Sequence, residues 1–493
     1  MILIALDNIN SFTYKEKYCI MVNSKRGFIM KINIFKLCVA IICSLLILFV
    51  TSCEDEPTPP IEECAHTECT WEWEEDAKCN QNNIMNYVCN KCGKIVDSKE
   101  AFKDHELVEE VEEATCTEKG SIHITCKNCS YVVNKKTDAL GHDYKYVIDE
   151  EATDEQYGYR HKECTRCGDK GERIAYVNNG FSSHGQLKVS GINLVDQNGD
   201  LMRLVGVSTH GLQWAGKYVN LSTFENMRNE FGINVMRLAL YTGERGYCTS
   251  TPERAEELYQ LVVDGINYCT ALDMYVIVDW HMLGADTTVD GDENPLYYKN
   301  EAIAFFDRIT KEFSDHQNIL FEIMNEPSGD TTWADCKEYA NAVIPVIRKN
   351  MPKAVILVGN PKWSADLVSV AKDPLGFTNI MYTFHFYAAD NTETGKIVTA
   401  IKAKLPVFIS EHGGMDADGD GEMNYNSLKK WYEVIDKYNL SFVAWNLSNT
   451  KGSASMFKTT TSTLDNFSDE LLKEWGVYYK QRVREVVGLP TTK

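Results

Sequence analysis

Positive charge is in short supply in this chain. Its 493 residues include 50 Lys and Arg against 71 Asp and Glu, which gives a formal net charge of −21 at pH 7. Because a phosphate backbone is bound by clustered cationic side chains, this deficit argues against nucleic acid or an anionic membrane surface as the main partner. A neutral substrate is compatible with it. Nine Trp and 25 Tyr supply aromatic faces for core packing and for stacking on flat ligands.

The chain also lacks a comfortable membrane span near its start. The apolar run at residues 37–50 is shorter than the roughly 20 residues that a spanning helix needs. It follows Lys31 and Lys36 and precedes Val50-Thr51-Ser52-Cys53, an ending that resembles a bacterial lipobox. We therefore predict a lipoprotein signal peptide at residues 30–52, cleaved before Cys53, with a lipid on its sulfur. A plain secretory peptide and an uncleaved anchor are the alternatives.

The segments flanking this signal are predicted to lie outside the fold. A typical signal would begin at Met30, so residues 1–29 are interpreted as an upstream extension from an incorrect start. Residues 53–63 form an acidic, Pro-rich linker without apolar periodicity. Its acidic residues resemble a surface-export signal of some Gram-negative lipoproteins. We expect a secreted protein, lipid-anchored to the outer membrane of a bacterial cell envelope and facing outward, with the lipid as its membrane contact.

Cysteine is scarce after residue 170, where only Cys248, Cys269 and Cys336 occur, and we interpret these three as buried free thiols. The region at residues 64–178 is Cys-rich instead. Three CxxC pairs recur there with a period of about 37 residues: Cys89/Cys92, Cys126/Cys129 and Cys164/Cys167. Small repeats with little apolar content need a covalent or metal staple to fold.

Each of the first two repeats offers one His and three Cys, the ligand set of a closed structural zinc site. We predict a zinc-ribbon-like site in each: His66, Cys79, Cys89 and Cys92 in the first, and His105, Cys116, Cys126 and Cys129 in the second. Disulfides are the alternative, because the compartment permits them. A CxxC redox centre is disfavoured, since no βαβ pattern surrounds these pairs.

The third repeat departs from this pattern. It has His142, but Asp154 stands where the third cysteine is expected. Its site is therefore predicted to be weaker, different or empty, unless His161 substitutes. Cys64 and Cys69 fall outside the repeats, and a bond between them is an open alternative.

From Phe181 onward, short apolar runs alternate with amphipathic segments that have helical periodicity, such as residues 252–271 and 427–438. Eight apolar runs occur, at residues 204–207, 235–240, 275–278, 319–324, 355–358, 380–384, 407–409 and 442–444. Eight strand-helix units predict an α/β fold, a (β/α)8 TIM barrel over residues 181–488, preceded by the Cys-rich repeats.

Chemically versatile side chains lie at or just past the ends of these runs. Barrel enzymes place their active sites at the C-terminal ends of the strands, so we expect these side chains to converge. They are His210, Arg237, His281, Asn325, Glu326, Trp363, His385, Tyr387, Glu411 and Trp445. Each alone has an ordinary structural interpretation, such as a packed His or a salt-bridged Arg, but together they indicate a catalytic cleft.

At these positions the sequence resembles the endoglucanase (cellulase) branch of glycoside hydrolase family five. The matching segments are residues 208–214, 236–238, 279–281, 319–327, 385–387, 410–413 and 445–448. The resemblance implies a retaining endo-β-1,4-glucanase that hydrolyses cellulose-like or mixed-linkage glucans by double displacement. It implies Glu326 as the general acid/base and Glu411 as the nucleophile, with no cofactor for catalysis.

The resemblance also implies supporting roles. Arg237 and Tyr387 keep Glu411 charged, His385 lies near Glu326, and Asn325 bonds the sugar 2-hydroxyl. The residues expected to contact substrate are His210, Trp214, His281, Trp363, Trp445 and Lys451. For the three Trp, core packing is the alternative to stacking on sugar. The branch usually carries a Lys five positions after the last of these Trp, but here Thr450 stands there and Lys451 follows, which leaves that contact open.

Two Asp-Gly-rich loops, residues 286–294 and 416–422, are interpreted as flexible rims of the cleft, with adventitious calcium as the alternative. Loops decide which polymer a barrel accepts, so the same machinery acting on mannan, xyloglucan or lichenan is a rival hypothesis. A rival of another class is a non-catalytic glycan-binding surface lipoprotein. We expect the protein to act as a monomer.

Overall fold

The computed structural model describes residues 64–153, 156–283, 293–461 and 467–491. The signal peptide, Cys53, the acidic linker, Asp154 and most of the loop at residues 286–294 lie outside the described residues, so the predictions made for them stay predictions. Within the described part of the chain, no helix is long and apolar enough to cross a membrane. The chain divides into two compact units, Met1–Val108 with Cys126–Tyr131 and Glu109–Thr125 with Val132–Lys493.

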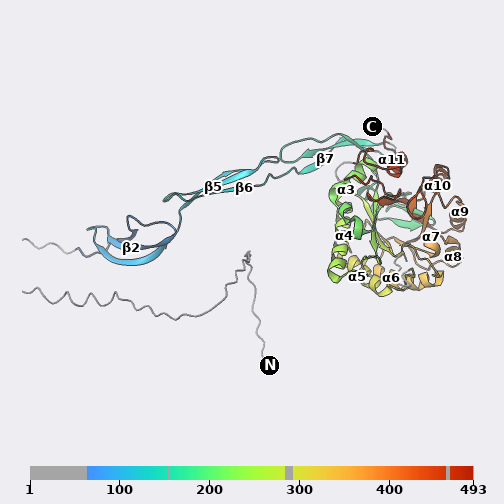
Figure 1. The fold of residues 1–493 in the computed structure, drawn as a ribbon, viewed down its shortest axis with the longest axis horizontal. Coiled ribbons are helices and arrows are strands. Elements are labelled where there is room, and N and C mark those ends of the chain that lie inside the picture. The colour runs from blue at the N-terminus through green and yellow to red at the C-terminus, as the bar shows by residue number, and fades with distance from the viewer. Residues whose placement is uncertain (1–63, 154–155, 284–292, 462–466, 492–493) are drawn as a thin grey trace, which may run out of the picture. The chain divides into compact units, whose positions relative to one another are not determined.

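Each Cys-rich repeat forms a small sheet of three strands (Figure 1). The strands are β1 (Cys69–Trp73), β2 (Gln81–Cys89) and β3 (Ile95–Lys103) in the first, β4 (Leu107–Glu112), β5 (Gly120–Cys126) and β6 (Val132–Thr137) in the second, and β7 (Tyr144–Glu150), β8 (Gly158–Cys164) and β9 (Ile174–Tyr176) in the third. Most of their side chains are partly or fully exposed, and the few buried residues include Cys89, Cys126 and Cys164. The sheets therefore have too little buried apolar surface to be stable on packing alone.

The rest of the chain confirms the predicted barrel. Eight parallel strands close in sequence order: β12 (Val205–Thr209), β13 (Val235–Tyr241), β14 (Tyr275–His281), β15 (Ile319–Glu322), β16 (Ile356–Val358), β17 (Ile380–Tyr387), β18 (Val407–Gly413) and β19 (Phe442–Leu447). Each contains or overlaps one of the eight predicted apolar runs. All eight strands are buried along their whole length, as expected for a parallel sheet covered on both faces.

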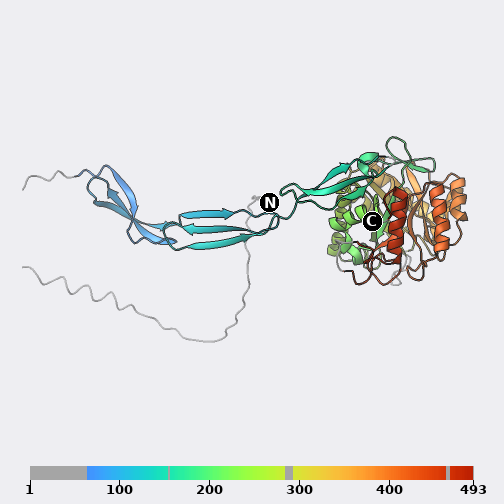
Figure 2. The ribbon, with the colours of Figure 1, turned by 90° about the horizontal axis from the view of Figure 1, so that it is seen from above.

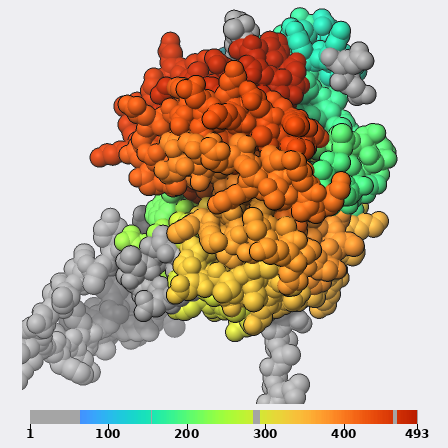
Figure 3. Space-filling model, turned by 90° about the vertical axis from the view of Figure 1, so that its right-hand side faces the viewer, coloured from blue at the N-terminus to red at the C-terminus, as the bar shows by residue number. Residues whose placement is uncertain are grey.

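Helices pack around the outside of the strands (Figure 2). The longer ones are α3 (Leu221–Asn226), α4 (Pro252–Ala271), α5 (Lys299–Glu312), α6 (Trp333–Asn350), α8 (Leu367–Lys372), α9 (Gly395–Lys402), α10 (Tyr425–Lys437) and α11 (Glu474–Val487). Shorter turns of helix are α1 (Phe181–His184), α2 (Leu212–Ala215), η2 (Gly216–Tyr218), η3 (Met227–Phe231) and α7 (Pro361–Ser364). Residues of the second half of the chain, coloured yellow to red, make up most of the face in Figure 3.

Local sequence explains where the main helices begin. Thr251 caps α4 by accepting a hydrogen bond from the amide of Arg254, and Pro252 follows at a position that needs no amide donor. Helix α6 starts with a reciprocal cap between Thr332 and Asp335. These caps align the helices so that their apolar faces contact the strands.

The barrel interior is filled at its N-terminal end. Leu187, Leu194 and Met202, around the small hairpin β10 (Lys188–Ser190) and β11 (Asn193–Val195), pack against inward-facing strand residues. Along β14, Tyr275 and Ile277 belong to this inner cluster, whereas Val276 and Val278 belong to the layer between strands and helices. With this end plugged, the opposite, C-terminal end carries the open cleft.

The three cysteines of the barrel are free. Cys269 and Cys336 are fully buried, as predicted, whereas Cys248 is only partly buried.

Candidate active site

A cleft of about 520 Å³ opens at the C-terminal end of the barrel. Its lining includes most of the residues that the sequence places past the strand ends: His210, His281, Glu326, Trp363, His385, Tyr387, Glu411 and Trp445. Seven of the eight strands bring these side chains together, although the first and last are 235 positions apart (445 minus 210).

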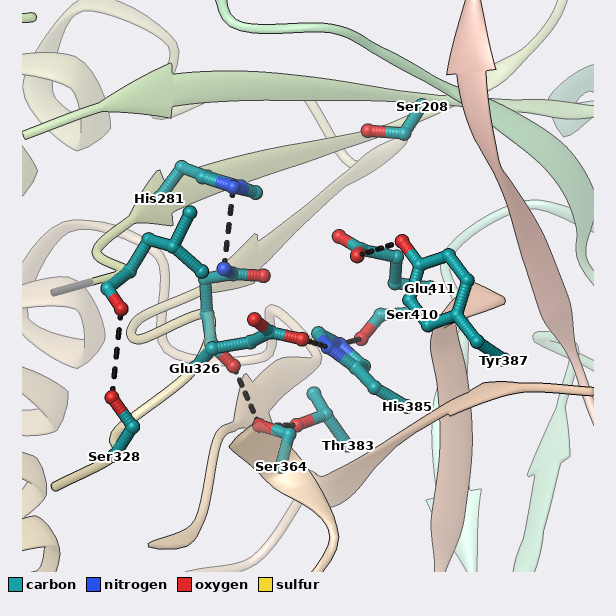
Figure 4. Close-up of polar contacts among 12 residues, drawn as sticks. Ser208, His281, Glu326, Ser328, Ser364, Thr383, His385, Tyr387, Ser410 and Glu411 are labelled. Carbon is teal, nitrogen blue, oxygen red and sulfur yellow. Dashed lines mark hydrogen bonds and ion pairs between the residues drawn. The ribbon is translucent and has the colours of Figure 1, made fainter. Parts of the chain in front are cut away.

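Glu326 and Glu411 face each other across this cleft (Figure 4). Glu326 follows β15, and Glu411 lies within β18. Three atoms lie within 4.8 Å of one another: a carboxylate oxygen of Glu326, a carboxylate oxygen of Glu411 and a ring nitrogen of His385. Both carboxyl groups are almost buried, with residue exposures of 7% for Glu326 and 4% for Glu411. Two buried carboxyl groups at this separation cannot both ionise without compensation.

Glu411 receives that compensation from two donors. The Tyr387 hydroxyl donates a hydrogen bond of 2.7 Å to Oε1, and Arg237 Nη1 donates one of 3.2 Å to Oε2. Burial, and after it the neighbouring Glu326, raise the pKa of Glu411, whereas contacts with His385, Arg237 and Tyr387 act against that rise. These donors therefore favour the ionised form that a nucleophile requires.

Arg237 is a fully buried cation that forms ion pairs with three carboxylates. Its guanidinium lies 3.0 Å from Asp279, 2.7 Å from Glu322 and 3.2 Å from Glu411. It also donates a 2.6 Å hydrogen bond to Asn325 Oδ1. Although burial alone lowers the pKa of an Arg, these carboxylates raise the pKa of Arg237, so it stays charged. A planar guanidinium suits this role because its five N–H groups are held in a rigid fork.

His385 joins Glu326 to a second buried carboxylate. Its Nδ1 lies 2.7 Å from Glu326 Oε1, and its Nε2 lies 2.9 Å from Ser410 Oγ. Ser410 Oγ in turn donates a 2.8 Å hydrogen bond to Glu322 Oε1. Burial by itself lowers the pKa of His385, but its contacts with Glu322 and Glu326 raise it to about 10. The imidazole thus holds a proton next to Glu326.

Asn325 is oriented by three partners. Its Oδ1 accepts from Arg237, and its Nδ2 donates to the Met282 carbonyl at 3.2 Å and lies 3.3 Å from His281 Nε2. His281 Nδ1 lies 2.6 Å from Asp279 Oδ2. Burial lowers the pKa of His281 well below its usual value, so the ring is neutral, donates to Asp279 and accepts from Asn325. The side-chain amide of Asn325 therefore has one orientation.

Aromatic rings form one wall of the cleft. The His281 ring stacks between Tyr241 and Trp445, with centroids 4.1 Å and 5.2 Å away. His210 lies against Trp445 at 5.4 Å and against Trp214 at 5.3 Å. Burial lowers the pKa of His210 to about 4, and its Nδ1 has no hydrogen-bond partner among the described residues. The neutral His210 ring therefore forms part of the cleft wall, with its Nδ1 buried within that wall.

Two of the predicted Trp platforms are exposed. Trp363 has 56% of its surface exposed and lines the cleft, held there by α7, in which Lys362, Trp363 and Ser364 all have left-handed backbone angles. Trp214 is 48% exposed beside His210, outside the cleft lining. Core packing is therefore excluded for both. Trp445 is nearly buried but keeps part of its ring in the cleft wall.

Lys451 lies elsewhere. It lines a separate pocket with Asp420, Lys473 and Trp475, and it does not belong to the cleft lining. Its predicted contact with substrate therefore stays a prediction. The loop at residues 416–422, by contrast, contributes Ala417, Asp418 and Gly419 to the cleft, which confirms its interpretation as a rim.

The sequence interpretation missed four residues of the site. Asp279, Glu322 and Ser410 belong to the matching segments quoted above, but only their contacts with Arg237 and His385 assign them a part in it. Tyr241 ends β13 and stacks on His281. Its position after an apolar run was the one available signal.

The structure revises the Cys and His grouping of the repeats. Three groups have ligand atoms that all lie within 4.8 Å of one another: Cys64, His66, Cys89 and Cys92; Cys79, His105, Cys126 and Cys129; and Cys116, His142, Cys164 and Cys167. Cys79 therefore belongs to the ligand group of the second repeat, and Cys116 to that of the third, one repeat later than predicted. The loop that carries each of them reaches the CxxC turn of the next sheet.

The remaining predictions for the repeats change accordingly. The third group is complete without His161, whose Nδ1 lies 2.9 Å from Asp149 instead, and it is a different site from those predicted for the first two repeats, because Cys116 supplies its third sulfur. The alternative of a bond between Cys64 and Cys69 is also wrong. Cys64 completes the first group, and the Cys69 thiol donates to the His66 carbonyl.

Comparison with known proteins adds an independent finding. A family model described as cellulase (glycosyl hydrolase family 5) matches residues 195–451. Endoglucanase A of Butyrivibrio fibrisolvens is 43% identical over 307 residues, which are 62% of this chain and 70% of that protein. An endoglucanase of Clostridium saccharobutylicum is 38% identical over 302 residues, 61% of this chain and 65% of that protein.

Among solved structures, the catalytic domain of Thermobifida fusca endoglucanase Cel5A, in a variant complexed with cellotetraose, is similar with a TM-score of 0.57. It is 30% identical in sequence, and the match covers 62% of this chain and 99% of that domain.

Proposed function

The chain belongs to glycosyl hydrolase family 5, the cellulase family, and on that premise we propose that it is a retaining endo-β-1,4-glucanase. The observation that carries the proposal is the facing pair Glu326 and Glu411, with carboxylate oxygens within 4.8 Å of each other. Retaining enzymes hold their two carboxyl groups about 5–5.5 Å apart, whereas inverting enzymes need about 6.5–9.5 Å to admit a water between them. The separation here matches direct attack on the sugar.

In the first step, Glu411 attacks the anomeric carbon while Glu326 gives a proton to the departing glycosidic oxygen. The bond to the leaving sugar breaks as the bond to the Glu411 oxygen forms, which leaves a glycosyl-enzyme ester. Tyr387 and Arg237 hold the attacking carboxylate in position before the step. Because their hydrogen bonds are already made, little reorganisation accompanies the attack.

The proton for the first step is stored in the hydrogen bond between His385 and Glu326. His385 Nδ1 lies 2.7 Å from Glu326 Oε1, and the pKa of His385 is raised to about 10, so the imidazole carries this proton at neutral pH. Transfer of that proton to Glu326 Oε1 makes the acid that the leaving group needs. Ser410 and Glu322 keep the other side of the imidazole paired during this transfer.

In the second step, Glu326 is a carboxylate and takes a proton from water, which attacks the anomeric carbon and releases Glu411. Two inversions at one carbon give net retention. We assign the contact with the sugar 2-hydroxyl to Asn325, whose amide orientation is set by Arg237 and His281; this contact strengthens as positive charge develops on the ring.

The substrate class is supported by the relatives and by the cleft. The two matched curated relatives are named endoglucanases, and the similar Thermobifida fusca domain was solved with cellotetraose. In this chain, exposed Trp363 and the ring of Trp445 offer flat apolar faces in the cleft, which suit the faces of pyranose rings. A neutral glucan polymer also agrees with the net charge of −21.

The test is hydrolysis of a panel of soluble β-glucans, mannans, xyloglucans and lichenan, with the anomer of the first product resolved by NMR. We expect release of β-anomeric cello-oligosaccharides, and loss of hydrolysis in both Glu326→Ala and Glu411→Ala. Faster turnover of mannan or xyloglucan would replace the substrate assignment. An α-anomeric first product would exclude the covalent intermediate, and binding without hydrolysis would favour the non-catalytic alternative.

We also propose that the mature protein is a monomer anchored to the outer surface of the cell envelope by a lipid on Cys53. Support comes from the lipobox-like ending at residues 50–53 and the acidic residues after it. Metabolic labelling with a radioactive fatty acid tests the anchor, with Cys53→Ala expected to abolish both labelling and membrane recovery. Protease treatment of intact cells tests the outward orientation, and light scattering of the detergent-free Cys53→Ala protein tests the monomer.

We further propose that the repeats bind structural zinc, while catalysis itself needs no cofactor. Support comes from the three groups of three Cys and one His, a ligand set typical of closed zinc sites. Zinc content of the purified protein, measured by mass spectrometry, tests this proposal.

A further inference from the structure

The spacing of the ligand atoms in the repeats matches the edges of a tetrahedron around one zinc ion. With Zn–S bonds of about 2.3 Å and Zn–N bonds of about 2.0–2.1 Å, tetrahedral geometry sets S···S edges near 3.8 Å and S···N edges near 3.5 Å. The S···S distances are 3.6 Å for Cys64/Cys89, 3.8 Å for Cys79/Cys126 and 3.8 Å for Cys116/Cys164. The S···Nδ1 distances are 3.4, 3.4 and 3.3 Å for Cys92/His66, Cys129/His105 and Cys167/His142.

The CxxC turns are shaped to aim both sulfurs at one point. Gly93 and Gly168 directly follow their CxxC pairs with left-handed φ values of 73° and 74°, which a residue with a side chain rarely adopts. Their amides bond back to the carbonyls of Cys89 and Cys164 at 2.8 Å and 2.9 Å. In the second repeat the amide of Asn128 donates to Cys126 Sγ, so the sulfur is also held by the backbone.

The histidines are placed by neighbouring rings. His105 stacks on Tyr131 at 4.2 Å, and His142 stacks on Tyr144 at 5.1 Å. In both, Nδ1 faces the second Cys of the CxxC pair. This arrangement uses all four side chains of each group. A disulfide within a group of three Cys would leave one thiol and the His without a role, so the geometry favours a metal over a disulfide.

The second and third groups each take their ligands from two consecutive sheets. In the second group, Cys79 comes from the loop between β1 and β2, whereas Cys126 and Cys129 come from the turn between β5 and β6. In the third, Cys116 comes from the loop between β4 and β5, whereas Cys164 and Cys167 follow from β8. His105 and His142 lie in the connections between those sheets, whereas His66 of the first group precedes β1.

We propose that zinc ions bound at these three groups act as clamps, and that the second and third each join a loop of one repeat to the CxxC turn of the next. The first clamp ties the chain before β1 to the first sheet through Cys64. The last is a site absent from the sequence prediction, formed by Cys116, His142, Cys164 and Cys167, and it ties the second sheet to the third. This inference concerns the repeats alone and is independent of the catalytic proposal.

The shared ligands explain why the third repeat lacks a cysteine at the position of Cys79 and Cys116. Those residues lie ten positions before their own CxxC pair, and Asp154 lies ten positions before Cys164. Under the clamp arrangement this position supplies a ligand to the following repeat. No CxxC pair follows Cys167, because the barrel comes next. A cysteine at residue 154 would therefore have no site to complete.

The third sheet, in turn, is held to the barrel by polar contacts instead of a metal. The Tyr146 hydroxyl donates to Glu225 at 2.8 Å and accepts from Asn229 at 2.7 Å. Arg160 donates to Asn229 at 3.0 Å and lies 4.1 Å above the Tyr146 ring. The last zinc clamp thus connects the second repeat to a sheet that is itself fixed on α3 and η3.

The test is the zinc content of full-length protein and its variants after dialysis against a chelator. We expect three zinc ions per wild-type chain and two in Cys79→Ser or Cys116→Ser. The decisive variant is the double substitution Cys79→Ser with Cys129→Ser. Shared ligands place both residues in one site and predict two remaining ions, whereas grouping by repeat places them in two sites and predicts none.

Cys69→Ser is the matched control, since its thiol lies beside the first group, near Cys89, and donates to the His66 carbonyl without being one of the grouped ligands. We expect it to keep three ions. Cobalt substitution adds a second readout: a tetrahedral site with three sulfur ligands gives strong visible absorption, which should fall by one third in Cys116→Ser. Hydrolysis of a soluble glucan by each variant shows that the barrel is folded.

Two results would overturn the proposal. One is wild-type protein with no bound zinc and no titratable thiols in the repeats, which would establish disulfides. The other is loss of all zinc in the Cys79→Ser and Cys129→Ser double variant with wild-type hydrolysis, which would restore grouping by repeat. Neither outcome affects the catalytic proposal, because hydrolysis is measured separately.

Discussion

Replacing Tyr387 by Phe removes a hydroxyl that donates a 2.7 Å hydrogen bond to the nucleophile, Glu411 Oε1. A hydrogen bond to a charged, buried group is worth about 1.5–3 kcal/mol. Because this bond stabilises the ionised carboxylate, its loss raises the pKa of Glu411. At about 1.4 kcal/mol per unit, the expected rise is about 1–2 units. The acidic limb of kcat/KM should move to higher pH by the same amount.

The assay is the pH dependence of kcat/KM on a soluble cello-oligosaccharide with a chromogenic leaving group. Above the displaced limb, some loss of rate is expected, because the hydroxyl also aims the carboxylate. The matched control is Tyr339→Phe, whose hydroxyl donates a buried 2.7 Å bond to the Ile323 carbonyl, away from the carboxyl pair. It should lower the free energy of unfolding by about 0.5–1.5 kcal/mol and leave the limb in place.

The reasoning is refuted if Tyr387→Phe lowers the rate without moving the acidic limb. In that case the hydroxyl positions the substrate or the carboxylate but does not influence ionisation. A shift of equal size in Tyr339→Phe would likewise contradict it, because the effect would then follow from loss of stability alone.

Four further outcomes are expected. Glu326→Ala should lower kcat on an unactivated glucan by about 10²–10⁴-fold and affect a substrate with a good leaving group much less; equal losses on both would contradict its role as the acid. The pKa of His385 is raised to about 10, so wild-type activity should persist at alkaline pH until this residue loses its proton. The variant His385→Asn should move the alkaline limb of kcat/KM to lower pH. Trp363→Ala should raise KM for long cello-oligosaccharides by about 2–10-fold, because about 0.5–1.5 kcal/mol of stacking is lost. Lys451→Ala should leave KM unchanged, and a comparable rise in KM for this variant would show that Lys451 contacts the substrate. Although burial opposes it, contacts with Arg237 and His385 lower the pKa of Glu322 from 4.5 to about 2. The stabilisation that ionised Glu322 contributes is therefore fully present above pH 4.5 and is lost as pH falls through about 2. Measuring the free energy of unfolding against pH in wild type and in Glu322→Gln tests this expectation.

The positions of the catalytic carboxyl groups could be predicted because they follow directly from strand order. Glu326 and Glu411 each come at or just after an apolar run, and a closed parallel barrel places every such position at one end. His385, Tyr387 and Trp445 were found for the same reason. For these residues, the position at the end of an apolar run is enough to predict the position at the C-terminal end of the barrel, so no knowledge of side-chain contacts was needed.

The buried network behind the carboxyl groups could not be predicted in the same way. Glu322 and Ser410 lie inside apolar strands, where a sequence pattern does not tell which side chain faces inward or what it meets. Their roles depend on the register between β15, β17 and β18 and on the Arg237 side chain from β13. For a related reason the sequence pattern does not tell which pocket receives the side chain of Lys451, which follows β19 and lines a pocket other than the cleft.

The Cys-rich repeats show most clearly what the sequence determines by itself and what only the tertiary structure decides. By itself the sequence determined the ligand types, the period of the CxxC pairs and the need for a staple, because these depend on composition and spacing. It also determined the barrel, through eight apolar runs separated by helical segments. Only the tertiary structure decided which Cys joins which site, since Cys79 and Cys116 reach across to the next sheet and a ligand group is defined by distance in space. For the same reason, only the structure decided that one guanidinium, Arg237, serves Asp279, Glu322 and Glu411 together.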